Sequence, residues 1–171
     1  MIGKKMEKAL NDQINAELYS AYIYLAMAAY FDSENLTGSA SWMRVQTQEE
    51  TAHAMKIYDF VNERGGRVTL QAIEKPPKGW KSALEAFEAA YKHEKYITGR
   101  INKLVDLAIQ EKDHATNAFL QWFVNEQVEE ETSVDAVVQN LKMAAKAPGA
   151  LFMIDRELGQ RTFTPPTQEG A

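Results

Sequence analysis

Four segments of this chain have the residue spacing of amphipathic helices, and each is interrupted near its middle by residues that ionise or form hydrogen bonds. The interruptions follow one frame that occurs twice, 77 positions apart. Its members pair as Glu17 with Glu94, Glu50 with Gln127, and His53 with Glu130. All six stand where an alternating spacing of four and three residues would place an apolar side chain in the core of a helical bundle. This pattern limits the possible folds more than any other feature of the chain.

The apolar residues around these positions define four stripes, within residues 10–31, 43–60, 84–108 and 120–141. Each stripe is long enough to be one side of a long helix, and together the four predict a helical bundle. Apart from Glu94, we expect the third stripe to place these residues in the core: Leu84, Phe87, Tyr91, Thr98, Ile101, Val105 and Ala108.

Turn and capping residues predict where the helices begin and end. We expect helices over about 4–31, 37–64, 83–110, 114–145 and 150–158. Gly65 and Gly66 end the second, and the segment Ser82 to Glu85 is a capping box that opens the third. The first pair and the second pair of long helices are joined by turns of a few residues, which predicts two antiparallel hairpins.

The connection between the two hairpins, residues 65–81, is much longer and contains Pro76 and Pro77. Fully extended, it would reach roughly 55–60 Å, whereas a helix of about 28 residues is roughly 42 Å long. It can therefore run the length of the bundle and make the second and third helices parallel. The sequence thus predicts an all-α four-helix bundle over residues 1–146 with one long crossover. A short fifth helix would follow within 147–160, and a C-terminal tail over 161–171.

The composition excludes several classes of protein. Hydrophobic residues make up 45% of the chain and charged residues 25%, as in ordinary globular domains. The net charge is −5 and no basic stripe is present, so nucleic acid is not an expected partner. No apolar run approaches the length of a membrane span, and the N-terminus lacks a signal-peptide pattern. There is no cysteine, and we expect a cytoplasmic protein without thiolate metal sites.

Four carboxylates in one core would cost far more free energy than a domain can spare unless something neutralises them. Two ferrous ions would do so, because carboxylates and an imidazole suit Fe(II) and four glutamates balance two divalent ions. Glu50 is the natural bridge, with Glu17 and His53 completing one iron site. Glu94 and Glu130 would hold the second iron. Gln127 is either a weak ligand or a hydrogen-bond donor.

At this point three segments resemble one family: 15–24 (NAELYSAYIY), 49–53 (EETAH) and 126–130 (EQVEE). The chain is similar over nearly its whole length to non-haem ferritins of the bacterial and archaeal type. The resemblance implies a ferritin-like fold and a ferroxidase that oxidises Fe(II) with O2 or H2O2. It also implies self-association into a hollow cage, commonly of 24 subunits, that stores the ferric oxide mineral. The short fifth helix would pack around a symmetry axis of that cage.

The same resemblance implies roles for residues beside the iron pair. A third iron position would fall on four acids: Glu49, Glu126, Glu129 and Glu130. Tyr24 corresponds to a tyrosine next to the site, and Trp122 to a nearby aromatic residue. Each has a simpler interpretation, because charged runs on helices are usually solvated and a tyrosine on a core stripe usually just packs.

Departures from related families narrow the prediction. Thr51 stands where a bacterioferritin would carry its haem-ligating methionine, so we expect no haem. A rubrerythrin would need cysteines to bind its additional iron, and this chain has none. Asn117 and Leu120 replace the acids that line the three-fold pores of animal ferritins. His93 and His114 are expected at the surface.

Two other functions fit a di-iron bundle less well. One is an oxidase or oxygenase that acts on an organic substrate, which would need an apolar substrate cavity. The other is a structural cage subunit with a degenerate site, which the intact set of ligands opposes. The number of iron ions held per chain would separate all three functions.

Overall fold

The computed structural model describes residues 1–147 and 149–165. It contains five helices: α1 (Lys4–Ser33), α2 (Thr37–Glu63), α3 (Ala83–Gln110), α4 (His114–Ala144) and α5 (Ala150–Leu158). The described residues contain no strand, so the predicted all-α class is confirmed, and every predicted helix is present with ends shifted by at most two residues. None of these helices is long and apolar enough to cross a membrane. The predicted tail over 161–171 is described only as far as residue 165.

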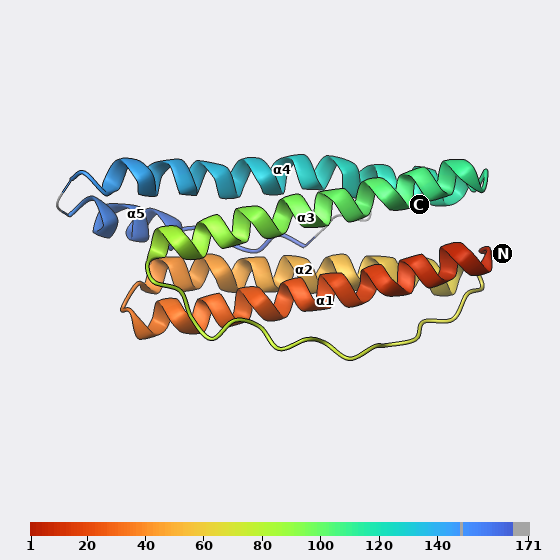
Figure 1. Cartoon of the computed structure of the whole chain (residues 1–171), viewed down its shortest axis with the longest axis horizontal. Helices are drawn as coiled ribbons and strands as arrows, with labels where there is room; N and C mark the ends of the chain where they lie inside the picture. Colours follow the sequence, from red (N-terminus) through yellow and green to blue (C-terminus); the bar gives the residue numbers. More distant parts are fainter. Residues whose placement is uncertain (148, 166–171) are drawn as a thin grey trace.

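The helices form a bundle of two antiparallel hairpins joined by the long crossover (Figure 1). α1 pairs with α2 and α3 pairs with α4, and the crossover returns along the whole bundle so that α2 and α3 run in the same direction. α5 folds back at one end of the bundle, where it contacts α2 and α4. The segment after α5 then runs back along the bundle toward its middle.

Polar side chains of α1 hold the crossover in place. Asn11 accepts a hydrogen bond from the Thr69 amide at 2.6 Å and donates to the Arg67 carbonyl at 3.0 Å. One turn later, Asn15 donates to the Ala72 carbonyl at 3.1 Å. The crossover therefore has a defined path without a regular secondary structure of its own, because α1 supplies hydrogen-bond partners that its backbone would otherwise find only in water.

The helix ends follow the predicted capping chemistry with one difference. Gly65 adopts a positive φ of 68°, as expected for a glycine just after a helix. The Ser82 hydroxyl accepts from the Glu85 amide at 3.1 Å, but the Glu85 carboxylate accepts from the Lys81 amide instead of that of Ser82. The capping box is thus shifted by one residue on its return side.

The interior of the bundle is divided along its length. One apolar cluster, which includes Phe31 and Phe87, fills the end that carries α5. A second cluster, which includes Leu10 and Leu120, fills the end that carries the N-terminus. The buried glutamates lie at intermediate positions on each helix, so a polar layer separates two apolar ones, as the four stripes predict.

The prediction of which α3 residues face the core was wrong along one edge of the stripe, where the buried residues lie one position earlier in the sequence. Four residues of the predicted stripe are only half-buried: Leu84, Tyr91, Thr98 and Val105. The residues that precede them are buried instead: Ala83, Ala90, Ile97 and Leu104. They form the core side with Phe87, Glu94, Ile101 and Ala108. Tyr91 and Thr98 instead line an open groove of about 620 Å³ between α3 and α4.

α5 is attached to the beginning of α2 by a single carboxylate. Asp155 accepts hydrogen bonds from the Gly38 amide at 3.0 Å, the Ser39 amide at 2.7 Å and the Ser39 hydroxyl at 2.7 Å. The amides at the start of a helix have no partner within that helix, and a carboxylate there is also favoured by the helix dipole. Gly38 lets the two backbones approach closely, because a Cβ at that position would lie 1.6 Å from the Asp155 carbonyl oxygen.

Candidate metal centre

The polar layer draws side chains from all four long helices. α1 contributes Glu17, α2 contributes Glu50 and His53, α3 contributes Glu94, and α4 contributes Gln127 and Glu130. None of the six side chains is more than 4% exposed. Such a set of buried acids around one imidazole is rare in a core without a function, because each ionised group loses its hydration on burial.

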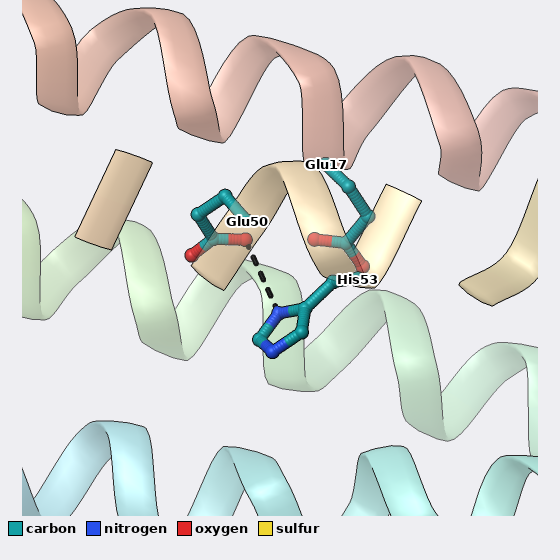
Figure 2. Close-up of side chains that lie close together, drawn as sticks. All are labelled: Glu17, Glu50 and His53. Atoms are coloured by element: carbon teal, nitrogen blue, oxygen red, sulfur yellow. Dashed lines mark ion pairs between the residues drawn. The ribbon is translucent and has the colours of Figure 1, made fainter. Parts of the chain in front are cut away.

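Three of the predicted ligands converge on one point. Glu17, Glu50 and His53 each offer an atom within 4.8 Å of the others, and Figure 2 shows the two carboxylates facing each other above the imidazole. One oxygen of Glu17 and one of Glu50 are buried without a hydrogen-bond partner among the described residues. A buried carboxylate oxygen that accepts no hydrogen bond is costly, and a cation placed between these groups would remove that cost.

His53 faces carboxylates with both ring nitrogens. Its Nδ1 lies 3.5 Å from Glu50 and its Nε2 lies 3.8 Å from Glu126. His53, Glu126 and Glu130 form a second group whose ligand atoms lie within 4.8 Å of one another. The edge of the imidazole packs against Trp122, with ring centres 5.4 Å apart. A carboxylate on the far nitrogen fixes the orientation of an imidazole that binds a metal through the other nitrogen.

Three glutamine amides hold three of the four glutamates. Gln13 donates to Glu17 at 2.8 Å, Gln46 donates to Glu130 at 2.9 Å, and Gln127 donates to Glu94 at 3.2 Å. Sequence reasoning missed the roles of Gln13 and Gln46, although Gln46 lies on a predicted core stripe. Each amide fixes one oxygen of its glutamate. Glu50 receives no such donor among the described residues, as suits a carboxylate that would bridge two ions.

Tyr24 lies beside the site, as the family resemblance implies. Its side chain is fully buried, and its hydroxyl donates to Glu94. Burial, followed by the charge of Glu94, raises the pKa of the Tyr24 hydroxyl well above its usual value, so the phenol stays protonated. Both oxygens of Glu94 therefore accept hydrogen bonds, one from Tyr24 and one from Gln127. Glu94 belongs to the same layer but does not join either group of converging ligand atoms.

Three residues of the layer hold protons more strongly than they would in water: Glu50, Glu94 and His53. Burial, followed by the charge of Glu94, raises the pKa of Glu50 well above its usual value. Burial, followed by the charge of Glu130, raises that of Glu94 to about 8. Burial lowers the pKa of His53, but the neighbouring carboxylates of Glu126 and Glu50 outweigh burial and raise the pKa overall. Metal ions binding here would displace these protons, so their affinity should increase with pH.

The acids implied for a third iron position do not share one environment. Glu126 is half-buried and lies near His53, whereas Glu129 is exposed and joins neither group of converging ligand atoms. Glu49 is half-buried and forms an ion pair at 2.6 Å with Arg161, from the segment after α5. Burial raises the pKa of Glu49 to about 7, although the Arg161 charge opposes that shift. No periodic pattern in the sequence could have indicated the contact with Arg161.

The surface location expected for His93 was wrong. Its ring is half-buried, its Nε2 lies 2.8 Å from the Ser20 hydroxyl, and its edge packs against Tyr24. Burial lowers the pKa of His93 to about 4, so the ring is neutral near pH 7. Adjacent residues on a helix point in different directions, and His93 therefore packs between α3 and α1 while Glu94 points into the layer.

We expect a Glu94→Gln substitution to stabilise the iron-free protein at high pH. Between its unfolded value of 4.5 and its folded value of about 8, Glu94 keeps its proton only when folded. Its contribution to the free energy of unfolding is therefore fully present below pH 4.5 and is lost as the pH rises through 8. Glutamine does not ionise, so the variant should gain on the order of 1–2 kcal/mol above that range. Thermal unfolding with a chelator present, at both ends of the range, measures the difference.

The matched control for that experiment is Glu88→Gln, which removes an exposed carboxylate of the same helix together with one surface ion pair. Such pairs contribute little, so this variant should follow the unmodified protein at both pH values. An equal gain from both substitutions would mean that net charge, and not the buried position of Glu94, determines the effect.

Fold and site together define a class: a four-helix bundle whose middle layer offers carboxylates and an imidazole to metal ions. Comparison with known proteins gives the family. The family model for ferritin, described as a ferritin-like domain, matches residues 7–144. The chain is 44% identical over 161 residues to a bacterial non-heme ferritin of Bacteroides fragilis, covering 94% of this chain and 100% of that one. It is 40% identical over 163 residues to one of Staphylococcus aureus, covering 95% and 98%.

Comparison with solved structures gives the same family. An open pore ferritin from the hyperthermophilic archaeon Archaeoglobus fulgidus superimposes with a TM-score of 0.94 at 57% identity, covering 95% of this chain and all of that one. A closed form of the same archaeal ferritin, engineered by site-directed mutagenesis, also superimposes with a TM-score of 0.94. The chain belongs to the ferritin family. Ferritins are iron-storage proteins that assemble from many subunits, and iron storage is the function that this membership assigns.

Proposed function

We propose that the polar layer is a ferroxidase centre, which oxidises Fe(II) to Fe(III) before the iron is stored. The observation that carries the proposal is the convergence of Glu17, Glu50 and His53, with a buried oxygen on each carboxylate that accepts no hydrogen bond from the described residues. Buried oxygens without donors suit a hard cation, and the imidazole favours iron over calcium or magnesium. Two Fe(II) ions would supply two electrons to O2 or H2O2.

Each residue of the layer has a role in this proposal. Glu17 and His53 hold one iron, Glu94 and Glu130 hold the other, and Glu50 bridges the two. Glu94 would exchange its hydrogen bonds with Tyr24 and Gln127 for metal ligation, so Gln127 acts first as a donor that orients Glu94. Tyr24 supplies a proton or a hydrogen bond to the second iron site. Glu49, Glu126 and Glu129 would take up a third iron beside the pair.

Several finer features stay proposals. The cage is expected to contain 24 subunits, with O2 or H2O2 as the oxidant and a cytoplasmic location. α5 presents Leu151, Phe152 and Met153, which are exposed in the single chain. Exposed apolar residues on a short helix suit contacts between neighbouring subunits. In a ferritin cage, those neighbours would be further copies of this chain.

The test combines particle mass with iron counting. Purified protein receives Fe(II) in air, the oxidation is followed by absorbance, and the iron retained in each particle is measured after gel filtration. Storage with ferroxidase activity predicts a large particle that oxidises iron rapidly and retains far more than three ions per chain.

The other outcomes separate the alternatives. About two ions per chain with no growth on further loading would indicate a di-iron oxidase or oxygenase that acts on another substrate. A particle that retains no iron, and in whose presence Fe(II) oxidises no faster than in buffer, would indicate a structural cage subunit and would contradict the ferroxidase proposal.

A further inference from the structure

Arg161 lies against Glu49, the residue next to Glu50 of the polar layer, although it comes from the end of the described chain. Its guanidinium donates to Glu49 at 2.6 Å and stacks over the Trp42 ring, with its carbon 4.4 Å from the ring centre. Side-chain exposure is only 23% for Arg161 and 17% for Glu49, so solvent screens this ion pair weakly. The partners are 112 residues apart in sequence.

The rest of the fold fixes where Arg161 can reach. Asp155 attaches α5 to the first turn of α2, and Arg161 follows six residues later. Trp42 and Glu49 lie two turns apart on α2, so stacking on the indole directs the guanidinium toward the carboxylate. The second terminal nitrogen of Arg161, Nη1, is buried without an acceptor among the described residues. A buried donor without a partner is unusual in a contact that serves only to fasten a chain segment.

The position of Arg161 matters because of what surrounds Glu49. Glu49 directly precedes Glu50, and Glu126 and Glu130 form the neighbouring ligand group with His53. A third iron held by carboxylates would need Glu49, one of whose oxygens already accepts a hydrogen bond from the Arg161 guanidinium. A guanidinium and a divalent ion compete for the same carboxylate charge.

We propose that Arg161 is a tethered cation that competes with a third iron ion for Glu49, and so sets how strongly that ion binds. Arg161 thereby acts as a positioning residue for the site, through Glu49. This inference rests on the proposed ferroxidase centre, and it adds a link from α5 to the iron site. When the third ion binds, the guanidinium leaves Glu49 and the segment that carries it loosens.

The test is an anaerobic titration of the assembled, iron-free protein with Fe(II), in which calorimetry measures the binding of each ion. An Arg161→Gln substitution should leave the two tightest ions unchanged and strengthen the third roughly five- to tenfold, the range expected when one charge-assisted bond no longer competes. Arg161→Lys keeps the charge and should remain close to the unmodified protein. The matched control is Arg156→Gln, because it removes the same charge from an exposed position on α5.

Two further measurements make the result decisive. In a Glu49→Gln background, adding Arg161→Gln should have no effect, because nothing is left to compete for. In the unmodified protein, hydrogen exchange over residues 159–165 should accelerate when the third equivalent of Fe(II) is added, and not with the first two.

The outcomes distinguish this inference from the proposed function. Third-ion affinity that is unchanged or weaker in Arg161→Gln, with two ions still bound tightly, would overturn the competition and leave the ferroxidase proposal standing. Failure of the unmodified protein to bind two ions tightly would overturn the ferroxidase proposal itself. An equal effect of Arg156→Gln would mean that the net charge of the protein, and not competition for Glu49, changes the affinity for the third ion, and would overturn the inference.

Discussion

Replacing Glu50 with glutamine is expected to slow the rapid phase of Fe(II) oxidation by a factor of roughly 100 or more, because loss of a ligand should exceed the 10- to 100-fold typical of residues that only orient ligands. Glutamine keeps the size of the side chain but removes its charge and replaces one of the two oxygens that would bridge the ions with an amide nitrogen, which does not bind metal ions. His53→Ala should have a similar effect, since it removes the only imidazole of the layer. Stopped-flow absorbance with Fe(II) and air measures the rapid phase.

The bundle should remain folded in both variants. Burial raises the pKa of Glu50, so the iron-free protein gains nothing from ionising it and should tolerate a neutral amide. Circular dichroism and particle mass check this point. Glu63→Gln is the matched control, because Glu63 is an exposed acid at the end of the same helix. Oxidation at the unmodified rate in Glu50→Gln would contradict the assignment of the bridging ligand.

Replacing Gly38 with alanine is expected to detach α5 from the bundle. The added Cβ would lie 1.6 Å from the Asp155 carbonyl oxygen and 2.6 Å from its carbonyl carbon, and backbone atoms cannot move aside as a flexible side chain can. The three hydrogen bonds to Asp155 would then be lost, at about 1 kcal/mol each, which corresponds to a roughly hundredfold rise in the detached population.

Hydrogen exchange of the α5 amides reports that detachment directly, and mass photometry shows whether the assembly survives it. The first two ions should still be oxidised rapidly, because the ligands from Glu17 to Glu130 do not depend on α5. Gly99→Ala is the matched control, since a Cβ there would meet nothing within 4 Å. Unchanged exchange and unchanged particle mass in Gly38→Ala would show that α5 can dock without this close approach.

The sequence alone predicted the helices and the layer because both follow from periodicity. Glu17, Glu50 and His53 stand at core positions of long stripes, and a buried acid at a core position is informative in a way that a buried leucine is not. The crossover followed from its length, since no shorter path would connect the two hairpins in parallel.

The prediction failed where the residue spacing fitted two sets of core residues, or where the contact joins residues far apart in the sequence. On α3, Tyr91 and Thr98 share a spacing with the true core residues Ala90 and Ile97, and only the position of α4 decides which set is buried. The donor roles of Gln13 and Gln46 depend on where neighbouring helices place their glutamates. Arg161 acts across 112 residues, and its partner could be found only once α5 was located.

The division of the core into two apolar clusters has a consequence for how the bundle comes apart. Each end of the bundle has its own apolar cluster, whereas the middle holds carboxylates whose burial opposes folding. In the iron-free protein, separating the two hairpins therefore costs least at mid-height, whereas helices ordinarily fray from their ends. Iron bound in the layer would reverse that order, because the ions link all four helices there. Each subunit would then be held together at mid-height by the same ions that it oxidises.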